Sequence, residues 1–554
     1  RMSLDANTTA NYNTAVGSIA LSANTTGAAN TGLGYATLNL NTTGANNTAV
    51  GYAALNANTT GSYNTAVGHQ ALQASTADDH STAIGAQALM TQGAGGVGDG
   101  RNTAVGRDAG RLNTTGTYMV AVGYEALELN TTGSFNTSVG AGSLYNNTTG
   151  SQNVAVGHYS LLTNTTASNN TATGFEALKV NTTGANNTAL GKNALDSNTT
   201  GSRNVAIGMD ALDANTTASD NVAAGYNALA TNTTGANNVA VGMSSLLVNT
   251  TASNNTAIGK DALKANTTGH SNTAVGMFCL PANTTGVENV AMGRNAGESN
   301  TTGDYNVALG TNAFYTNTTG DTNTAVGALA LAVSTTASSN TAVGQGAGIT
   351  TTTGTSNVWI GRLAGNSSTT GVQNVAVGYN CRPNTVNGTN HIILGYDVTG
   401  AGSDNITMGK GAGADRIWNQ YVSNATWTRS SDERIKKDIT TNTDCGLAFI
   451  NDLRTVTYKF KAPSELASSM TEYDADNNTA SYDKKMYGFI AQEVKVAMDT
   501  HSITDFAGWN QLEDGGDNMQ GISYEMFVMP LVKAIQELST KNDALVARIT
   551  ALEA

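Results

Sequence analysis

The sequence predicts a mainly β fold: a parallel β-solenoid or β-roll of short repeats, followed by an α-rich (α+β) domain that ends in a coiled-coil helix. Three observations predict it. The motif Asn-Thr-Ala-Val-Gly recurs at a fixed step, apolar residues keep the same place in every repeat, and both patterns stop near residue 415, where charged residues become frequent. A period this strict is the signature of a solenoid.

The array has a 17-residue period, which its marker glycine defines. This glycine recurs at the same interval from Gly17 to Gly85 and again from Gly106 to Gly395, with one longer step between the two series. These glycines mark 23 repeats, and a shorter last step to Gly409 ends the array. The four extra residues of the longer step lie in the glycine-rich stretch 93–100. A unit of this length is too short for helical repeats, which need about 33 residues or more.

One repeat, residues 47–63, shows the elements that we expect in each coil. Thr48–Val50 and Ala53–Leu55 are two short strand-like pieces. Asn58–Gly61 has the composition of a turn, because asparagine tolerates the left-handed conformation and glycine adopts positive φ without strain. We therefore predict parallel coils stacked about 4.8 Å apart.

Stacking places equivalent side chains of successive coils in columns. The residue before the marker glycine forms an apolar column, a leucine four residues after that glycine forms a second, and identical asparagines form amide ladders. The members that define the two apolar columns are Val50, Val67, Ile84 and Val105, and Leu55, Leu72, Leu89 and Leu127. So thin a coil has a small core of its own, which predicts that a further face is buried against other copies, most simply in a homotrimer.

Composition limits the function. The 554 residues carry a net charge of −13, and no basic stripe indicates a nucleic-acid partner. No apolar run approaches the ~18 residues of a membrane span, and the first residues lack the apolar core of a signal peptide, so we expect a segment upstream. Three distant cysteines and six scattered histidines predict neither disulfides nor a metal site. We expect no cofactor.

Three features of the repeats have more than one interpretation. Sequons such as Asn24-Thr25-Thr26 match N-glycosylation sites, but turn chemistry explains them. The threonine pairs resemble ice-binding rows, although Thr59 and Thr60 are adjacent in a turn. Aromatic rings after the marker glycine, as at Tyr52, either stack on sugars or pack between coils, and we favour packing.

The repeats over residues 7–410 resemble the head repeats of trimeric autotransporter adhesins, whose Asn-Ser-x-Ala-Ile-Gly units form a left-handed parallel β-roll in a trimer. They resemble still more the repeats that precede the self-cleaving chaperone domain of phage tail fibres. The adhesin repeats are shorter, and only the last step here, from Gly395 to Gly409, is similar to them in length. The resemblance implies a trimeric fibre.

The segment that follows the repeats carries chemistry. Residues 428–439 read Thr-Arg-Ser-Ser-Asp-Glu-Arg-Ile-Lys-Lys-Asp-Ile. They resemble the Ser-Asp-x-Arg-x-Lys signature that opens the S74 peptidase family, the intramolecular chaperone domains of phage tail spikes and fibres. The block Tyr487–Val494 and the stretch that begins at Tyr524 are similar to further blocks of that family, so the resemblance covers about residues 431–554.

A serine hydroxyl becomes a nucleophile when a base takes its proton, and a neutral lysine can be that base. The resemblance implies that Ser431 attacks the Ser430–Ser431 bond on its own N-terminal side, with Lys436 as the base and with Asp432 and Arg434 in supporting roles. Lys437 is the second candidate for the base. From the residues alone, Ser-Asp-Glu-Arg also fits a helix N-cap before a charged first turn.

The last residues predict a coiled coil. Leucines fall seven apart at d positions, and Ile535, Asn542 and Ile549 fall at a positions. Isoleucine at a with leucine at d favours parallel dimers, whereas the family resemblance implies trimers, so both states stay open. The leucines are Leu531, Leu538, Leu545 and Leu552.

These observations predict three parts: a repeat shaft over 1–410, a linker with the cleavage site over 411–430, and a chaperone domain over 431–554 whose terminal helix spans about 524–554. We expect a virion tail fibre or receptor-binding shaft that contacts a glycan or protein receptor on the host cell. The alternative is a trimeric adhesin on a bacterial surface. The expected enzyme activity is a single-turnover autoproteolysis with no external substrate.

Overall fold

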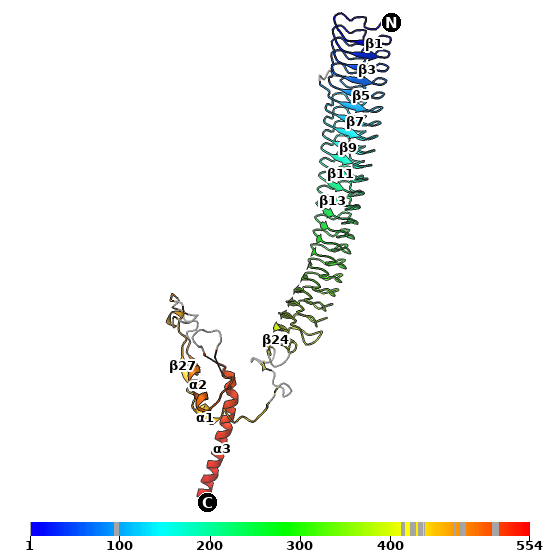
Figure 1. Ribbon diagram of the computed structural model, residues 1–554. Helices are drawn as coiled ribbons and strands as arrows, with labels where there is room; N and C mark the ends of the chain where they lie inside the picture. Colours follow the sequence, from blue (N-terminus) through cyan, green and yellow to red (C-terminus); the bar gives the residue numbers. More distant parts are fainter. Residues whose placement is uncertain are drawn as a thin grey trace. The chain divides into compact units, whose positions relative to one another are not determined.

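The computed structural model describes residues 2–93, 99–411, 416–421, 428–429, 436, 438–466, 468, 473, 475–476, 478, 484–511 and 520–554. The chain divides into two compact units, Arg1–Ser431 and Asp432–Ala554, which are described separately. The first unit is a mainly β parallel solenoid, and the second holds the helices (Figure 1).

Each coil of the solenoid contributes one short strand. The strands are β1 Thr14–Val16, β2 Thr31–Leu33, β3 Thr48–Val50, β4 Thr65–Val67, β5 Thr82–Ile84, β6 Thr103–Val105, β7 Val120–Val122, β8 Thr137–Val139, β9 Val154–Val156, β10 Thr171–Thr173, β11 Thr188–Leu190, β12 Val205–Ile207, β13 Val222–Ala224, β14 Val239–Val241, β15 Thr256–Ile258, β16 Thr273–Val275, β17 Val290–Met292, β18 Val307–Leu309, β19 Thr324–Val326, β20 Thr341–Val343, β21 Val358–Ile360, β22 Val375–Val377, β23 Ile392–Tyr396 and β24 Asn405–Lys410.

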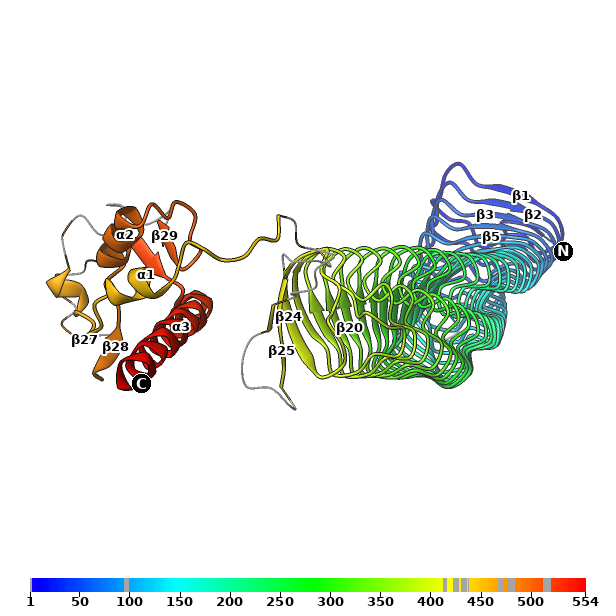
Figure 2. The ribbon, with the colours of Figure 1, turned by 90° about the horizontal axis from the view of Figure 1, so that it is seen from below.

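Successive strands pair in parallel and in register. Thr48 lies opposite Thr65, one repeat further along the chain, and the same pairing continues from β1 to β24. Figure 2 shows the strands side by side along the stack. The predicted parallel solenoid is therefore confirmed.

The second strand-like piece of the repeat is not a strand, so that part of the prediction is wrong. Ala53 and Leu55 have φ values of +53° and +52°, in the left-handed region that a strand excludes. The coils remain hydrogen-bonded there, because the Ala53 N–H donates to the Tyr35 carbonyl of the preceding coil at 2.8 Å and the Leu55 N–H donates to the Ala71 carbonyl of the next at 2.9 Å. Bonding between coils thus extends beyond the three-residue strands.

The core is a column of small side chains and leucines. Ala49, Ala54 and Leu55 are fully buried, as are their equivalents along the stack. The predicted apolar column before the marker glycine forms, but on the outer side of the coil. Alternate residues of a strand face opposite sides. Because Ala49 points inward, Thr48 and Val50 point outward.

The marker glycine meets a steric demand. Gly51 has a φ of +129°, and a Cβ atom placed on it would lie 2.5 Å from the carbonyl oxygen of Gly68 in the next coil. No larger residue fits between two coils that approach so closely.

Two ladders of buried asparagine amides connect the coils. The Asn58 amide nitrogen donates to Asn41 Oδ1 at 2.7 Å and to the Gly61 carbonyl at 2.9 Å. In the second ladder, the Asn47 amide nitrogen donates to that same carbonyl at 2.8 Å, and Asn47 Oδ1 accepts from the Asn64 N–H. The buried amide nitrogens of both ladders are thereby paired, as burial requires.

Contacts between coils bear on the alternative interpretations of the repeats. The Asn24 side chain is fully buried and its nitrogen is bonded to Asn7 and Gly27, so the folded coil withholds the atom that glycosylation would modify. Thr59 donates its hydroxyl to the Thr76 carbonyl, so the first threonine of the pair bonds the next coil, while the second, Thr60, is exposed. Aromatic rings of neighbouring coils stack on one another, as between Tyr35 and Tyr52 at 5.2 Å.

Near its C-terminal end the core changes composition. Trp359 is fully buried at a position that is alanine in most coils. Its ring lies against Gly348 and Gly365, which occupy the leucine position of their coils. One large side chain therefore replaces two leucines.

The second unit is a small α+β fold. Its elements are α1 Leu447–Asn451, β27 Val456–Tyr458, the 3-10 helix η2 Pro463–Glu465, β28 Met486–Gly488, α2 Ala491–Thr500, β29 Trp509–Gln511, β30 Gln520–Ile522, the 3-10 helix η3 Tyr524–Phe527 and α3 Val528–Glu553. β27 pairs with β28 and β29 with β30, both antiparallel.

An aromatic core holds these elements together. Phe506 packs edge-on against Phe449 of α1 and against Phe527 of η3. Met498 and Val494 of α2 are buried against this group. The long helix α3 contacts α1 and confirms the helix predicted at the end of the chain.

Candidate functional site

The chain that leads to the predicted scissile bond begins at the last coil of the solenoid. β25, Arg416–Gln420, turns back and pairs antiparallel with β24, which ends the run of parallel strands. β26, Thr428–Arg429, pairs in turn with β25, with Arg429 opposite Ile417 and Thr428 opposite Trp418. The described pairing therefore reaches Arg429, the residue before Ser430.

Most of the predicted catalytic residues lie outside the described part of the chain. Ser430, Ser431, Asp432, Arg434 and Lys437 belong to this group. Lys436 is described, and its side chain is exposed. The pairing of Ser431 with Lys436 thus stays a prediction, as does the supporting role of the acidic and basic neighbours.

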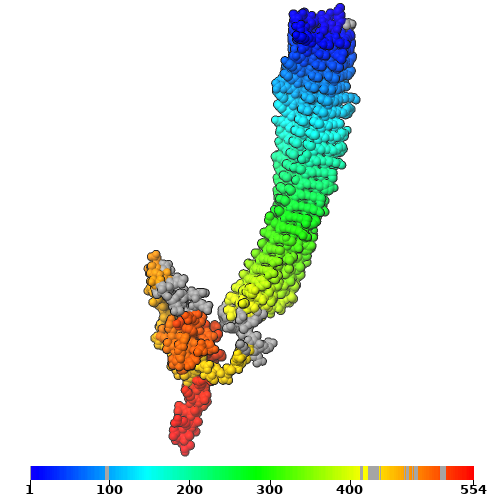
Figure 3. Space-filling model, viewed as in Figure 1, coloured from blue at the N-terminus to red at the C-terminus, as the bar shows by residue number. Residues whose placement is uncertain are grey.

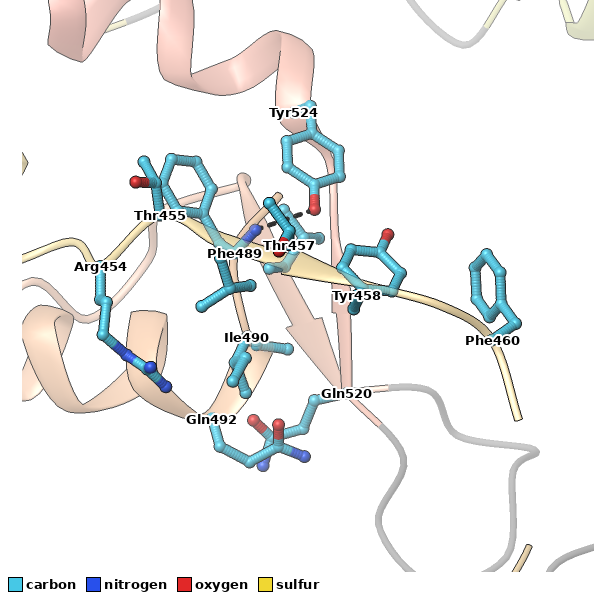
Figure 4. Close-up of a pocket in the computed structure, with 13 residues that line it drawn as sticks. Arg454, Thr455, Thr457, Tyr458, Phe460, Phe489, Ile490, Gln492, Gln520 and Tyr524 are labelled. Atoms are coloured by element: carbon cyan, nitrogen blue, oxygen red, sulfur yellow. Dashed lines mark hydrogen bonds between the residues drawn. The ribbon is translucent and has the colours of Figure 1, made fainter. Parts of the chain in front are cut away.

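The two C-terminal blocks that the sequence singled out lie together. The block 487–494 runs from β28 through a two-residue link into α2, and Tyr524 opens η3. The Phe489 N–H donates to the Tyr524 hydroxyl at 3.1 Å, and the rings of these residues stack with centroids 5.9 Å apart (Figure 4). Gly488 is needed here, since a Cβ atom on it would collide with that hydroxyl.

A cleft of about 830 Å³ opens beside this contact. β27 and the residues on either side of it form one wall, and the link 489–490, the start of α2, strand β30 and Tyr524 contribute the rest. Phe460, Ile490 and Tyr524 remain 49%, 38% and 45% exposed around it. Its polar groups are a guanidinium, hydroxyls and side-chain amides, so the described lining holds no nucleophile beside a general base.

Charged contacts fix the elements around the cleft. Arg454 makes a two-pronged ion pair with Glu493 of α2, and this hydrogen bonding lowers the pKa of the Glu493 carboxyl. His501 Nε2 lies 2.7 Å from Asp452 Oδ2. The Leu447 N–H at the start of α1 donates to Glu537 Oε2 of α3 at 2.9 Å, where a carboxylate is favoured by the helix N-terminus.

Sequence reasoning did not find this cleft. Tyr458 and Phe460 carry its exposed ring surface, and their rings meet edge-to-face at 5.5 Å. The one available signal was the alternation of polar and aromatic residues in 454–460, which by itself indicates only a short strand.

Within the described residues, no group of three or more histidine, cysteine, aspartate or glutamate side chains could hold a metal ion. Among the described helices, none is both long and apolar enough to cross a membrane.

Comparison with known proteins gives one match. Residues 431–503 match the family model described as chaperone of endosialidase, a peptidase family. No curated protein and no solved structure matches the chain. The match begins at Ser431, the residue predicted to be the nucleophile, and includes Lys436 and the block 487–494. The chain therefore joins a β-solenoid of 17-residue repeats to a segment that matches the chaperone of endosialidase.

Proposed function

We propose that this protein is the shaft of a trimeric tail fibre of a phage virion and that residues 431–554 are its intramolecular chaperone, which leaves by autoproteolysis. The observation that carries the proposal is the family match at residues 431–503, directly after a long repeat solenoid. In this proposal the shaft spans 1–410, the linker spans 411–430, and a host cell-surface receptor is the final partner.

A chaperone has a defined task in such a fibre. Parallel coils of nearly identical sequence have many non-native registers available, and pairings between distant segments form slowly. A compact C-terminal domain that associates first would hold the chains level at one end, so that the coils pair in one register. Cleavage afterwards removes the domain and leaves a fibre that is kinetically trapped.

The terminal helix supports association. The a and d side chains of α3 lie on its open side: Ile535, Leu538 and Leu552 are 65%, 55% and 84% exposed. Pro530 and Ala534, on the neighbouring face of the helix, are buried. A helix that exposes a heptad seam of this kind is expected to form a coiled coil with the equivalent helices of other copies.

The proposed cleavage is an acyl shift followed by hydrolysis. Ser431 Oγ attacks the carbonyl carbon of Ser430 while the Lys436 amine accepts its proton. The C–N bond breaks, the proton passes to the new α-amino group of Ser431, and an ester joins the two serines. Water, deprotonated by the same lysine, then releases the Ser430 carboxylate and regenerates the hydroxyl.

Intact-mass measurement of the purified chain tests this chemistry. Wild type is expected to give two pieces, 1–430 and 431–554, whereas Ser431→Ala and Lys436→Ala stay whole. Ser430→Ala and Lys437→Ala are matched controls, because each changes a neighbour of the same type and should still cleave. Cleavage of the Lys436→Ala variant, with loss of cleavage in Lys437→Ala, would transfer the base to Lys437.

A wild-type chain that stays whole after folding would show that the autoproteolysis assignment is wrong, and 431–554 would be a permanent oligomerising tip. Sedimentation measures the second element of the proposal, the number of chains. Immunodetection in purified virions, against bacterial envelope fractions, separates the tail-fibre assignment from the surface adhesin that the repeats also resemble.

A further inference from the structure

One outer face of the shaft carries a nearly unbroken column of apolar side chains beside a column of threonine and valine. This surface, called the strand face below, consists of the first and third residues of strands β1–β22 and their equivalents in β23 and β24. The third residue is apolar in every strand except β10, where it is Thr173. Leu190, Ile207 and Met292 in this column are 48%, 42% and 46% exposed.

The first residue of each strand completes the face. It is threonine, valine or isoleucine throughout β1–β23, and in β24 Ile406 takes the equivalent place. A strand that faces water on one side ordinarily alternates apolar and polar residues. Here the inward residue is a buried alanine in most strands, and the third, outward residue is apolar in every strand but β10, so this outward column has the composition of a covered surface.

The residue after the marker glycine also exposes apolar side chains, such as Tyr52 and Met209, but the face formed by the turns differs. The turn that follows the buried asparagine presents a threonine to solvent in most coils, such as Thr200 and Thr217, and both are exposed. Ser202 and Asp220 continue this polar surface. The space-filling view shows the coils as an unbroken column (Figure 3). Apolar surface that is continuous over so many coils exceeds the few hundred Å² that monomeric proteins leave uncovered.

The spacing of the strand face determines what can cover it. Its side chains repeat at each coil, about every 4.8 Å. A helix repeats about every 5.4 Å, so its side chains lose step with the coils within a few turns. A partner that stays in step over more than twenty coils must have the same rise, and a second copy of this chain has it.

We propose that copies of this chain pack against one another through their strand faces, parallel and level, so that equivalent coils meet. The inference rests on the proposed oligomeric fibre and adds which face lies between the chains and in which register. The exposed threonine surface then faces outward.

Crosslinking of single cysteines tests the face. The starting protein carries Cys279→Ala, Cys381→Ala and Cys445→Ala; the first two restore the alanine that most other coils have at that place. Ile207→Cys places a thiol on the strand face, and Thr217→Cys places one on the threonine surface of the same coil. Both are made in a chain carrying Ser431→Ala, oxidised, and compared on denaturing gels and by sedimentation.

In a trimer each disulfide joins two of the three thiols, so Ile207→Cys is expected to convert up to about two thirds of its chains to a disulfide-linked dimer. Thr217→Cys should remain monomeric on the denaturing gel. Assembly of Ile207→Cys chains with Ile258→Cys chains, three coils or about 14 Å apart, should link like to like only. Mixed links as frequent as like links would overturn the level register.

Two results overturn the choice of face: linkage through Thr217→Cys and not Ile207→Cys, or no linkage through Ile207→Cys in a protein that sediments as an oligomer. The latter result would not contradict the proposal that the protein is an oligomeric fibre. A protein that sediments as a monomer overturns the face and the proposed assembly together.

Discussion

Replacing Trp359 with alanine should destabilise the coils near the C-terminal end of the shaft and leave the stability of the other coils unchanged. The indole is fully buried, and the glycines on either side of it, Gly348 and Gly365, supply no side chain to fill the space that it leaves. Truncation of a buried tryptophan costs about 3 to 5 kcal/mol. Each coil contacts only its neighbours in a solenoid, so the loss stays within a few coils of residue 359.

Hydrogen exchange with mass spectrometry measures this local effect. At about 1.4 kcal/mol for each factor of ten, amides in 341–378 should exchange roughly 10² to 4 × 10³ times faster than in wild type. Peptides from 188–224 in the same molecule are the internal control and should be unchanged.

A rescue variant makes the prediction sharper. Trp359→Ala combined with Gly348→Leu and Gly365→Leu rebuilds the common coil, and leucine is compatible with the backbone, because Leu55 has φ +52° where Gly348 has +60°. Protection should return. Two results would refute the interpretation that one tryptophan fills the place of two leucines: unchanged hydrogen exchange in the single variant, or faster hydrogen exchange in the triple variant than in the single one.

Two buried titratable groups predict opposite pH effects in one shaft. Burial raises the pKa of Asp78 to about 6, so the stability that the protonated carboxyl allows is present below about pH 4 and is lost as pH rises through 6. The variant Asp78→Ala, which copies Ala167 at the same place in its coil, should therefore gain about 3 kcal/mol of local stability at pH 7. Hydrogen exchange around residues 64–93 measures this gain. An equal loss in that variant would contradict the sign. Burial lowers the pKa of His391 to about 4, so the coils around it lose up to about 3 kcal/mol of folding stability as pH falls from 6.5 to 4. The variant His391→Asn carries the asparagine that other coils have at this place, and it should abolish the acid-induced increase in hydrogen exchange of residues 375–410. Persistence of that acid effect in the variant would assign it to another group.

The sequence predicted the shaft because its pattern is periodic. A residue such as Val50 carries no structural information alone, but the same type at the same place in every repeat fixes the stack, the register and the alternation about Ala49. What the pattern did not predict was the backbone of 53–55. Apolar residues there are compatible with a strand, and only the need to turn within a short coil puts Ala53 and Leu55 in the left-handed region.

The sequence predicted which residues form the apolar columns, but not that the column of Val50 lies on the outer side of the coil. Nothing in Val50 itself distinguishes a core position from a face between chains, because both select apolar, β-branched residues. The distinction comes from the alanine beside it, which occupies the interior.

The C-terminal unit was predicted through motifs, and motifs locate blocks better than surfaces. The contact of Phe489 with Tyr524 joins two blocks that the sequence placed 35 residues apart. The cleft beside it depends on the packing of α2 against β29 and β30, which no local pattern specifies. The Ser431–Lys436 pair rests on spacing and family match, and its test is chemical.

The in-register stack also makes the shaft a ruler. Since every coil offers the same ladder to its two neighbours, removal or insertion of one whole repeat, for instance between Gly191 and Gly208, rejoins matching surfaces and changes the length by about 4.8 Å. Extra residues are accommodated where they lie outside the strand, as in the longer step from Gly85 to Gly106, whose flanking strands still pair in register. Genetic gain or loss of single repeats can thus set the reach of a fibre in fixed increments, while its ends and their chemistry stay the same.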